Sequence, residues 1–237
     1  MIVTIDGPAG AGKSTVARAL AQRLGFAYLD TGAMYRAVAL AALQRGVDWT
    51  QPDALAQLAR QIQIEFQNDR VLLDGADVTE AIRDWKITQI TPYVADNVEV
   101  RKRLIELQHR FCQGRNIVTE GRDQGTLVFP EAECKIFLTA SAEERARRRL
   151  AELQARGESA TLEEVLAAQQ RRDQEDASRP FGRLTRAPDA VEAPTDGLSI
   201  TEVVDRLADL VRRRQQEMVR SSCPCCPPES SHADINH

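Results

Sequence analysis

The start of the chain pairs a short apolar run with a segment of helical hydrophobic spacing. Residues 2–5 form a run rich in β-branched side chains, which is typical of a buried strand. A glycine-rich stretch follows, and after it the apolar side chains recur at helical spacing, at Val16, Ala17, Leu20 and Leu24. Gly25 comes next, and glycine commonly ends helices. The pattern predicts a strand, a glycine-rich loop and a helix.

The same rhythm continues along most of the chain. Apolar runs predict further strands at 26–29, 116–119, 134–138 and 190–193. Helical patterns lie between them, and Ser141, Thr161 and Ser199 each have a Glu three residues later, the pairing that begins many helices. Strands that alternate with helices form parallel sheets covered on both faces, with ligands at the carboxyl ends of the strands. We therefore predict an α/β protein with a five-stranded parallel sheet.

Residues from about 47 to 95 break this rhythm. A helix is expected near 52–61, followed by two alternating runs over 62–66 and 71–73 with a turn at Asn68 and Asp69. This block is interpreted as an insertion over the core that carries a hairpin.

Composition narrows the class of protein. Hydrophobic residues make up 43% of the 237 residues and charged residues 28%, as in ordinary globular domains. No apolar run approaches the ~18 residues of a membrane span, and the N-terminus lacks the features of a signal peptide, so a cytoplasmic location is expected. The net charge of −4 argues against nucleic-acid binding, while local arginine clusters suit a small anionic ligand. Nothing requires a partner chain, so a monomer is expected.

The strongest motif is a phosphate-binding loop. Residues 7–14 read Gly-Pro-Ala-Gly-Ala-Gly-Lys-Ser, which is G-x-x-x-x-G-K-S placed between a predicted strand and a predicted helix. The glycines let successive backbone N–H groups point at phosphate oxygens, and the helix N-terminus adds its positive dipole. In this motif Lys13 reaches the β and γ phosphates and Ser14 helps hold Mg²⁺. The loop alone leaves the phosphoryl acceptor open.

Arginines supply the second signal, because phosphoryl transfer depends on positioning and charge neutralisation. Residues 121–126, Gly-Arg-Asp-Gln-Gly-Thr, follow a central strand at the edge where open α/β sheets bind ligands. Burying Arg122 and Asp123 there without charged partners would be costly, which favours a functional role. Further candidate arginines are Arg36, Arg101, Arg145, Arg147, Arg148, Arg149, Arg172 and Arg179.

Four segments together resemble bacterial cytidylate kinases of the nucleoside-monophosphate kinase family. They are the loop 7–15, the run Asp-Thr-Gly-Ala-Met-Tyr-Arg over 30–36, the segment 121–130, and the run Arg-Asp-Gln-Glu-Asp-Ala-Ser-Arg over 172–179. The similarity extends from residue 1 to about 213. It implies transfer of the γ-phosphoryl group of ATP to CMP or dCMP with Mg²⁺, a P-loop domain over 1–218 whose insertion binds the acceptor, and a lid over about 145–180.

The resemblance also implies a role for each matching residue. Lys13, Arg122 and Arg179 would be catalytic, and Ser14 would hold Mg²⁺. ATP would be bound by Gly7, Pro8, Ala9, Gly10, Ala11, Gly12, Lys13, Ser14, Thr15 and, from the lid, Arg148. The acceptor would be bound by Asp30, Thr31, Arg36, Arg101, Arg122, Asp123, Arg172, Asp176 and Arg179, with Arg101 and Asp123 reading the cytosine edge.

Two features leave alternatives open. Pro92 stands where family members usually carry a base-contacting Ser, so a kinase for another monophosphate remains an alternative, as does a nucleotide-dependent switch. The tail over 219–237 lies outside the family pattern and is expected to be disordered. Its cysteines and histidines match no zinc template, although a metal-binding tail is a third alternative: Cys223, Cys225, Cys226, His232 and His237.

Overall fold

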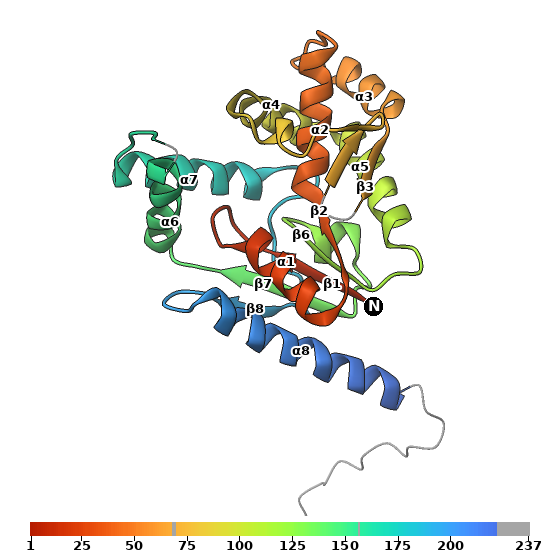
Figure 1. Cartoon of the computed structure of the whole chain (residues 1–237), viewed down its shortest axis with the longest axis vertical. Helices are drawn as coiled ribbons and strands as arrows, with labels where there is room; N and C mark the ends of the chain where they lie inside the picture. The colour runs from red at the N-terminus through yellow and green to blue at the C-terminus, as the bar shows by residue number, and fades with distance from the viewer. Residues whose placement is uncertain (68–69, 156, 222–237) are drawn as a thin grey trace, which may run out of the picture.

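The computed structural model describes residues 1–67, 70–155 and 157–221, and a five-stranded parallel sheet forms its centre (Figure 1). The strand order is β2–β6–β1–β7–β8, and every neighbouring pair is parallel. The strands are β1 (Ile2–Asp6), β2 (Ala27–Asp30), β6 (Ile117–Gly121), β7 (Cys134–Thr139) and β8 (Val191–Pro194). The five strands coincide with the five apolar runs, so the predicted sheet is confirmed.

Helices cover both faces of this sheet. On one face, α1 (Lys13–Leu24) and α8 (Ile200–Ser221) bury Leu20 and Leu207 against Val3 and Ile5 of β1. On the other, α2 (Thr31–Gln44) and α5 (Val98–Cys112) belong to a second apolar cluster that includes Ile117. Helix α8 continues to Ser221, three residues beyond the expected end of the domain. The rest of the tail, including its cysteines and histidines, lies outside the described residues.

The insertion contains the expected helix and hairpin, together with elements that the sequence pattern did not predict. The predicted elements are α3 (Pro52–Gln61) and the antiparallel pair β3 (Ile64–Gln67) and β4 (Arg70–Leu73), whose turn at 68–69 lies outside the described residues. Three unpredicted elements follow: β5 (Ala76–Asp77), a 3₁₀ turn η1 (Ala81–Arg83) and α4 (Trp85–Asp96).

Helix α4 forms although Pro92 lies inside it. Pro lacks an N–H and normally interrupts a helix. Here Ile87, Ile90 and Val94 are buried, and α4 packs against α2. This tertiary burial stabilises a helix that local propensity disfavours. Figure 1 shows α2, α3, α4 and α5 gathered at one end of the molecule, beyond strand β2.

The helices α6 (Ala142–Ala155) and α7 (Leu162–Ser178) pack on each other beside the phosphate loop. The capping pairs at Thr161 and at Ser199 form completely. At Ser141 only one of the two capping hydrogen bonds forms. Glu144 donates its N–H to the Ser141 hydroxyl at 3.3 Å, but its carboxylate accepts from Arg148, and the Ser141 N–H donates to Asp196. A nearby guanidinium therefore competes successfully for the capping carboxylate.

Candidate active site

The loop between β1 and α1 has the backbone that the phosphate-binding motif requires. Gly7, Gly10 and Gly12 have φ angles of +151°, +78° and +87°, which residues other than glycine rarely adopt. A Cβ at Gly7 would overlap the carbonyl oxygen of Leu138 in β7. Glycine is therefore needed at residue 7 for two reasons, the left-handed backbone and the close approach of the neighbouring strand.

Lys13 and Ser14 begin helix α1 at the end of this loop. The Lys13 ammonium is buried and donates to the carbonyl oxygen of Pro8 at 2.8 Å. Burial, aided by the positive charge of Arg122, lowers the pKa of Lys13 to about 7. The Ser14 hydroxyl donates to the carboxylate of Glu120 at 2.8 Å. Hydroxyl and carboxylate oxygens are ligands that suit Mg²⁺, so this pair fits the predicted metal site, and sequence reasoning missed Glu120.

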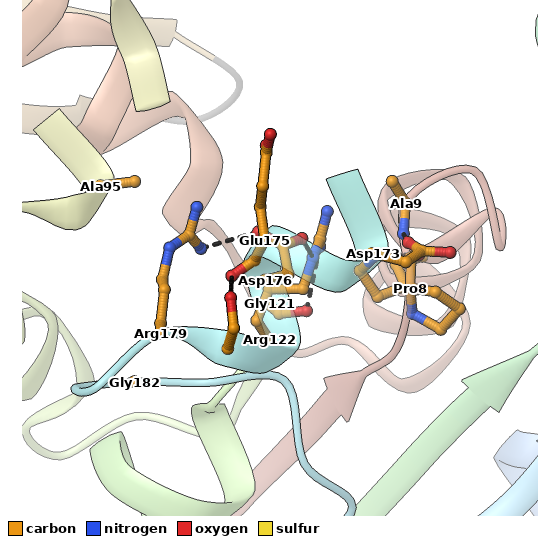
Figure 2. Close-up of polar contacts among 12 residues, drawn as sticks. Pro8, Ala9, Ala95, Gly121, Arg122, Asp173, Glu175, Asp176, Arg179 and Gly182 are labelled. Carbon is orange, nitrogen blue, oxygen red and sulfur yellow. Dashed lines mark hydrogen bonds and ion pairs between the residues drawn. The ribbon is translucent and has the colours of Figure 1, made fainter. Parts of the chain in front are cut away.

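Helices α6 and α7 contact the tip of the loop through an ion pair between a buried arginine and a partly exposed aspartate. Arg145 of α6 lies 2.7 Å from Asp173 of α7 and donates to the Ala9 carbonyl at 2.8 Å. Asp173 also accepts the Ala9 N–H at 3.3 Å, and Figure 2 shows its side chain beside Ala9 and Pro8. Arg148 donates to the hydroxyl and the carbonyl of Thr195, each at 3.1 Å. The α6–α7 pair is thus anchored on the loop, through an Asp173 contact that the sequence did not reveal.

The predicted acceptor-phosphate residues gather where β2 meets α2. Asp30 accepts the Ala33 N–H at 2.8 Å and so caps α2, and it pairs with Arg36 at 3.2 Å. Thr31 donates its hydroxyl to the backbone carbonyl of Glu120 at 2.7 Å. These contacts place Thr31 and Arg36 at the carboxyl ends of the adjacent strands β2 and β6.

Asp176 of α7 connects two of the predicted catalytic arginines (Figure 2). Its two carboxylate oxygens lie 2.7 Å from Nε of Arg122 and 2.7 Å from Nη1 of Arg179. Burial by itself raises the pKa of Asp176, but the two guanidiniums outweigh it and hold that pKa below its ordinary value. Arg179 also pairs with Asp96 of α4 at 2.6 Å. Burial and the charge of Arg122 lower the pKa of Arg172, which lies near this cluster.

Arg101 and Asp123, the two residues predicted to read the cytosine edge, form a buried ion pair. Arg101 also donates to the carbonyl oxygens of Ala95 at 3.1 Å and Gly182 at 3.4 Å, and its guanidinium lies 5.5 Å from the ring centre of Tyr35. Burial raises the pKa of the Asp123 carboxyl. Tyr35 lies in the 30–36 run, but the sequence assigned no role to it. Nothing in the sequence indicated that Gly182 would contact this pair.

No helix in the described part of the chain is both long and apolar enough to cross a membrane. No group of three or more His, Cys, Asp or Glu side chains in that same part could hold a metal ion. The hypothesis of a metal-binding tail falls on residues that the structure does not describe.

The phosphate loop lies at the end of the central strand β1 and faces a group of arginines at the ends of β2 and β6. This arrangement defines a P-loop phosphotransferase. The family model described as cytidylate kinase matches residues 3–213. The chain belongs to the cytidylate kinase family.

Relatives agree with this assignment. The chain is 51% identical over 222 residues to a cytidylate kinase of Rhodopirellula baltica, covering 94% of this chain and 97% of the relative. It is 46% identical over 220 residues to a cytidylate kinase of Geobacter sulfurreducens, covering 91% and 94%. A crystal structure of an uncharacterized protein from Eubacterium ventriosum superposes with a TM-score of 0.51 at 9% identity, covering 90% and 98%, which shows a shared fold alone.

Proposed function

We propose that this kinase transfers the γ-phosphoryl group of ATP to CMP or dCMP, giving ADP and CDP or dCDP. The observation that carries the proposal is the buried pair of Arg101 and Asp123 on the acceptor side of the phosphate loop. A carboxylate accepts from an exocyclic amine, and a guanidinium can donate to a ring nitrogen and a carbonyl. Cytosine offers all three groups along one edge.

The donor nucleotide would lie in the loop 7–15. Its backbone N–H groups and the N-terminus of α1 favour the negative phosphates, and Lys13 would turn from the Pro8 carbonyl toward them. Ser14 and Glu120 would hold Mg²⁺, which neutralises charge on the β and γ phosphates when bound. The α6–α7 pair would act as the lid over about 145–180, with Arg148 at the donor and the Arg145–Asp173 pair holding the loop.

The acceptor phosphate would meet Thr31, Arg36 and Arg122. In the described structure Arg36 and Arg122 pair with Asp30 and Asp176, which holds both guanidiniums in place before a phosphate arrives. Arg172 and Arg179 add positive charge where charge spreads over the transferring oxygens. Asp176 would also accept from the sugar hydroxyls of the acceptor. The insertion over about 47–95 would form the outer wall of this acceptor site.

A panel of acceptors tests the proposal. Purified protein is incubated with ATP, Mg²⁺ and each of CMP, dCMP, UMP, AMP and dTMP, and the diphosphate products are separated and quantified. We expect CMP or dCMP to give the highest kcat/KM, because uracil presents a carbonyl where Asp123 needs an amine. Equal or greater turnover of AMP or dTMP would contradict the cytidine assignment, which Pro92 leaves open.

A second arm separates a kinase from a nucleotide-dependent switch. Arg36→Ala and Arg122→Ala remove acceptor-side charges that lie outside the phosphate loop. A kinase should lose transfer to CMP in both variants, whereas a switch should keep its ATP hydrolysis unchanged. The expectations of a monomer, of a cytoplasmic location and of no nucleic-acid partner stay predictions.

A further inference from the structure

The turn after strand β6 begins with backbone amides that need partners. A single wide helical turn, η2 (Gln124–Val128), starts directly after Asp123. The first N–H groups of any helical segment point away from it and have no partner within it. The residue before such a segment commonly supplies a side-chain oxygen to these amides, and Asp is among the residues best suited to this. Asp123 stands at that position.

Asp6 supplies the oxygens instead. Its carboxylate accepts the N–H of Gln124 at 2.9 Å and the N–H of Gly125 at 2.7 Å. Asp6 ends strand β1, adjacent to the phosphate loop, so this cap comes from more than 100 residues away in the sequence. Asp123 does not cap the turn, and its carboxylate bonds Arg101.

We propose that Asp6 is a positioning residue for base recognition. By capping the 124–128 turn, it satisfies the amides that would otherwise attract the Asp123 carboxylate, and it leaves that carboxylate free to pair with Arg101 and the base. This inference rests on the proposed function, since it concerns the same acceptor.

The surroundings of Asp6 support this role. A Cβ at Gly125 would lie 3.4 Å from the Asp6 carboxylate and 3.0 Å from the Thr4 hydroxyl, so the turn packs closely on β1. The Gln124 side chain accepts from the Thr119 hydroxyl at 2.9 Å, which fixes the turn to β6 as well. Burial raises the pKa of Asp6 to about 7 although two backbone N–H groups donate hydrogen bonds to its carboxylate. Burying this charged group therefore costs electrostatic free energy.

Asp6→Asn is the direct test, because it keeps the size of the side chain but leaves only one acceptor oxygen for two amides. We expect KM for CMP to rise by at least about tenfold and the preference for CMP over UMP, as a ratio of kcat/KM, to fall by at least about tenfold, while KM for ATP changes by less than about threefold. The matched control is Asp48→Asn, which also removes a carboxylate that accepts a backbone N–H, that of Thr50, and should leave all three values unchanged.

A double-mutant cycle distinguishes this role from general structural support. If Asp6 acts through Asp123, Asp6→Asn should change the CMP-to-UMP ratio by less than about twofold when Asp123→Asn is already present. Full additivity of the two effects, or an equal rise in both KM values, would overturn the inference. A crystal structure of Asp6→Asn should show the Asp123 carboxylate turned toward the amides of its own turn, and an unmoved Asp123 would count against it.

The outcomes separate this inference from the proposed function. Failure of the unaltered protein to phosphorylate CMP would overturn the function itself. Normal CMP turnover together with an unchanged CMP-to-UMP ratio in Asp6→Asn would overturn only the role of Asp6. If Asp6→Asn does not give the circular dichroism spectrum of a folded protein, Asp6→Ser, which also leaves one acceptor oxygen, is measured by the same ratio and judged by the same outcomes.

Discussion

The ammonium nitrogen of Lys13 lies 2.8 Å from the carbonyl oxygen of Pro8, within the loop that would hold the phosphates of ATP. The side chain is therefore folded back onto its own loop. Because the site is buried and Arg122 adds positive charge nearby, the pKa of Lys13 is lowered to about 7. The charge of this lysine is thus coupled to the charge of whatever occupies the loop.

ATP binding should take up protons. At about pH 8, above the lowered pKa, Lys13 is largely neutral, and the negative phosphates raise its pKa and return the proton. Uptake should therefore approach one proton per ATP at about pH 8, and affinity should weaken as the pH rises from about 7 to 9. Titration calorimetry in buffers of different ionisation enthalpy measures the uptake. Lys13→Met is the control that should abolish most of it, and heats independent of the buffer in the unaltered protein would contradict the prediction.

Gly7→Ala should be far more damaging than Gly25→Ala. Both glycines have positive φ, but a Cβ at Gly25 meets nothing within 4 Å, whereas one at Gly7 would overlap the Leu138 carbonyl. We expect Gly25→Ala to cost about 1–2 kcal/mol of unfolding free energy from backbone strain. Gly7→Ala should cost about 1–3 kcal/mol more and also weaken ATP binding, because β1 and the loop must move away from β7.

Urea unfolding and ATP titration of the two glycine variants provide the measurements. Equal losses of stability in Gly7→Ala and Gly25→Ala would show that the contact with Leu138 is unimportant.

Arg36→Met should weaken the acceptor and spare the donor. Arg36 lies at the start of α2, beside Asp30, where the acceptor phosphate is proposed to bind. Loss of a charged hydrogen bond of about 1.5–3 kcal/mol should raise KM for CMP by at least about tenfold, with KM for ATP nearly unchanged. Arg45→Met is the matched control, since Arg45 forms an exposed ion pair with Asp74. Steady-state kinetics measure both KM values. A rise in KM for ATP alone would place Arg36 at the ATP site.

Leu207→Ala should destabilise the fold without altering the chemistry. Leu207 of α8 is 4% exposed and packs on the sheet face opposite α2, so a cavity should cost about 2–5 kcal/mol. Met218 lies in the same helix at 39% exposure, and Met218→Ala should change stability by about 0.5 kcal/mol or less. Thermal unfolding checks both variants, and kcat at 25 °C should be unchanged in each. Equal stability of the two variants would mean that α8 is not part of the core.

The sequence pattern predicted the central sheet because its strands are short, mostly apolar segments that lie between glycine-rich loops and helical patterns. Residues 2–5 and 134–138 are such segments, each with one polar residue, Thr4 or Lys135, and they form β1 and β7. The same reasoning missed α4, because Pro92 argues locally against a helix and only the burial of Ile87, Ile90 and Val94 stabilises it.

For the site, most of the residues predicted from sequence were carried by contiguous motifs, with Arg101 and Arg148 as exceptions. Gly12, Lys13 and Ser14 stand together because a phosphate loop is one local structure. Glu120 and Asp173 were missed because each acts on a residue far away along the chain. Their bonds to Ser14 and to Ala9 span 106 and 164 residues, and no spacing rule covers such distances.

The sequence by itself determined the five strands of the central sheet, most of the helices between them, the glycine-rich loop and the family, since all of these are carried by short stretches of neighbouring residues. Only the tertiary structure decided which charged side chains pair and which backbone groups they bind. Arg122 pairs with Asp176 and Arg101 with Asp123, while Asp6 accepts from the backbone N–H groups of Gln124 and Gly125. The physical reason is that parallel strands distant in sequence end at one edge of the sheet, where burial forces each charged group to find a partner.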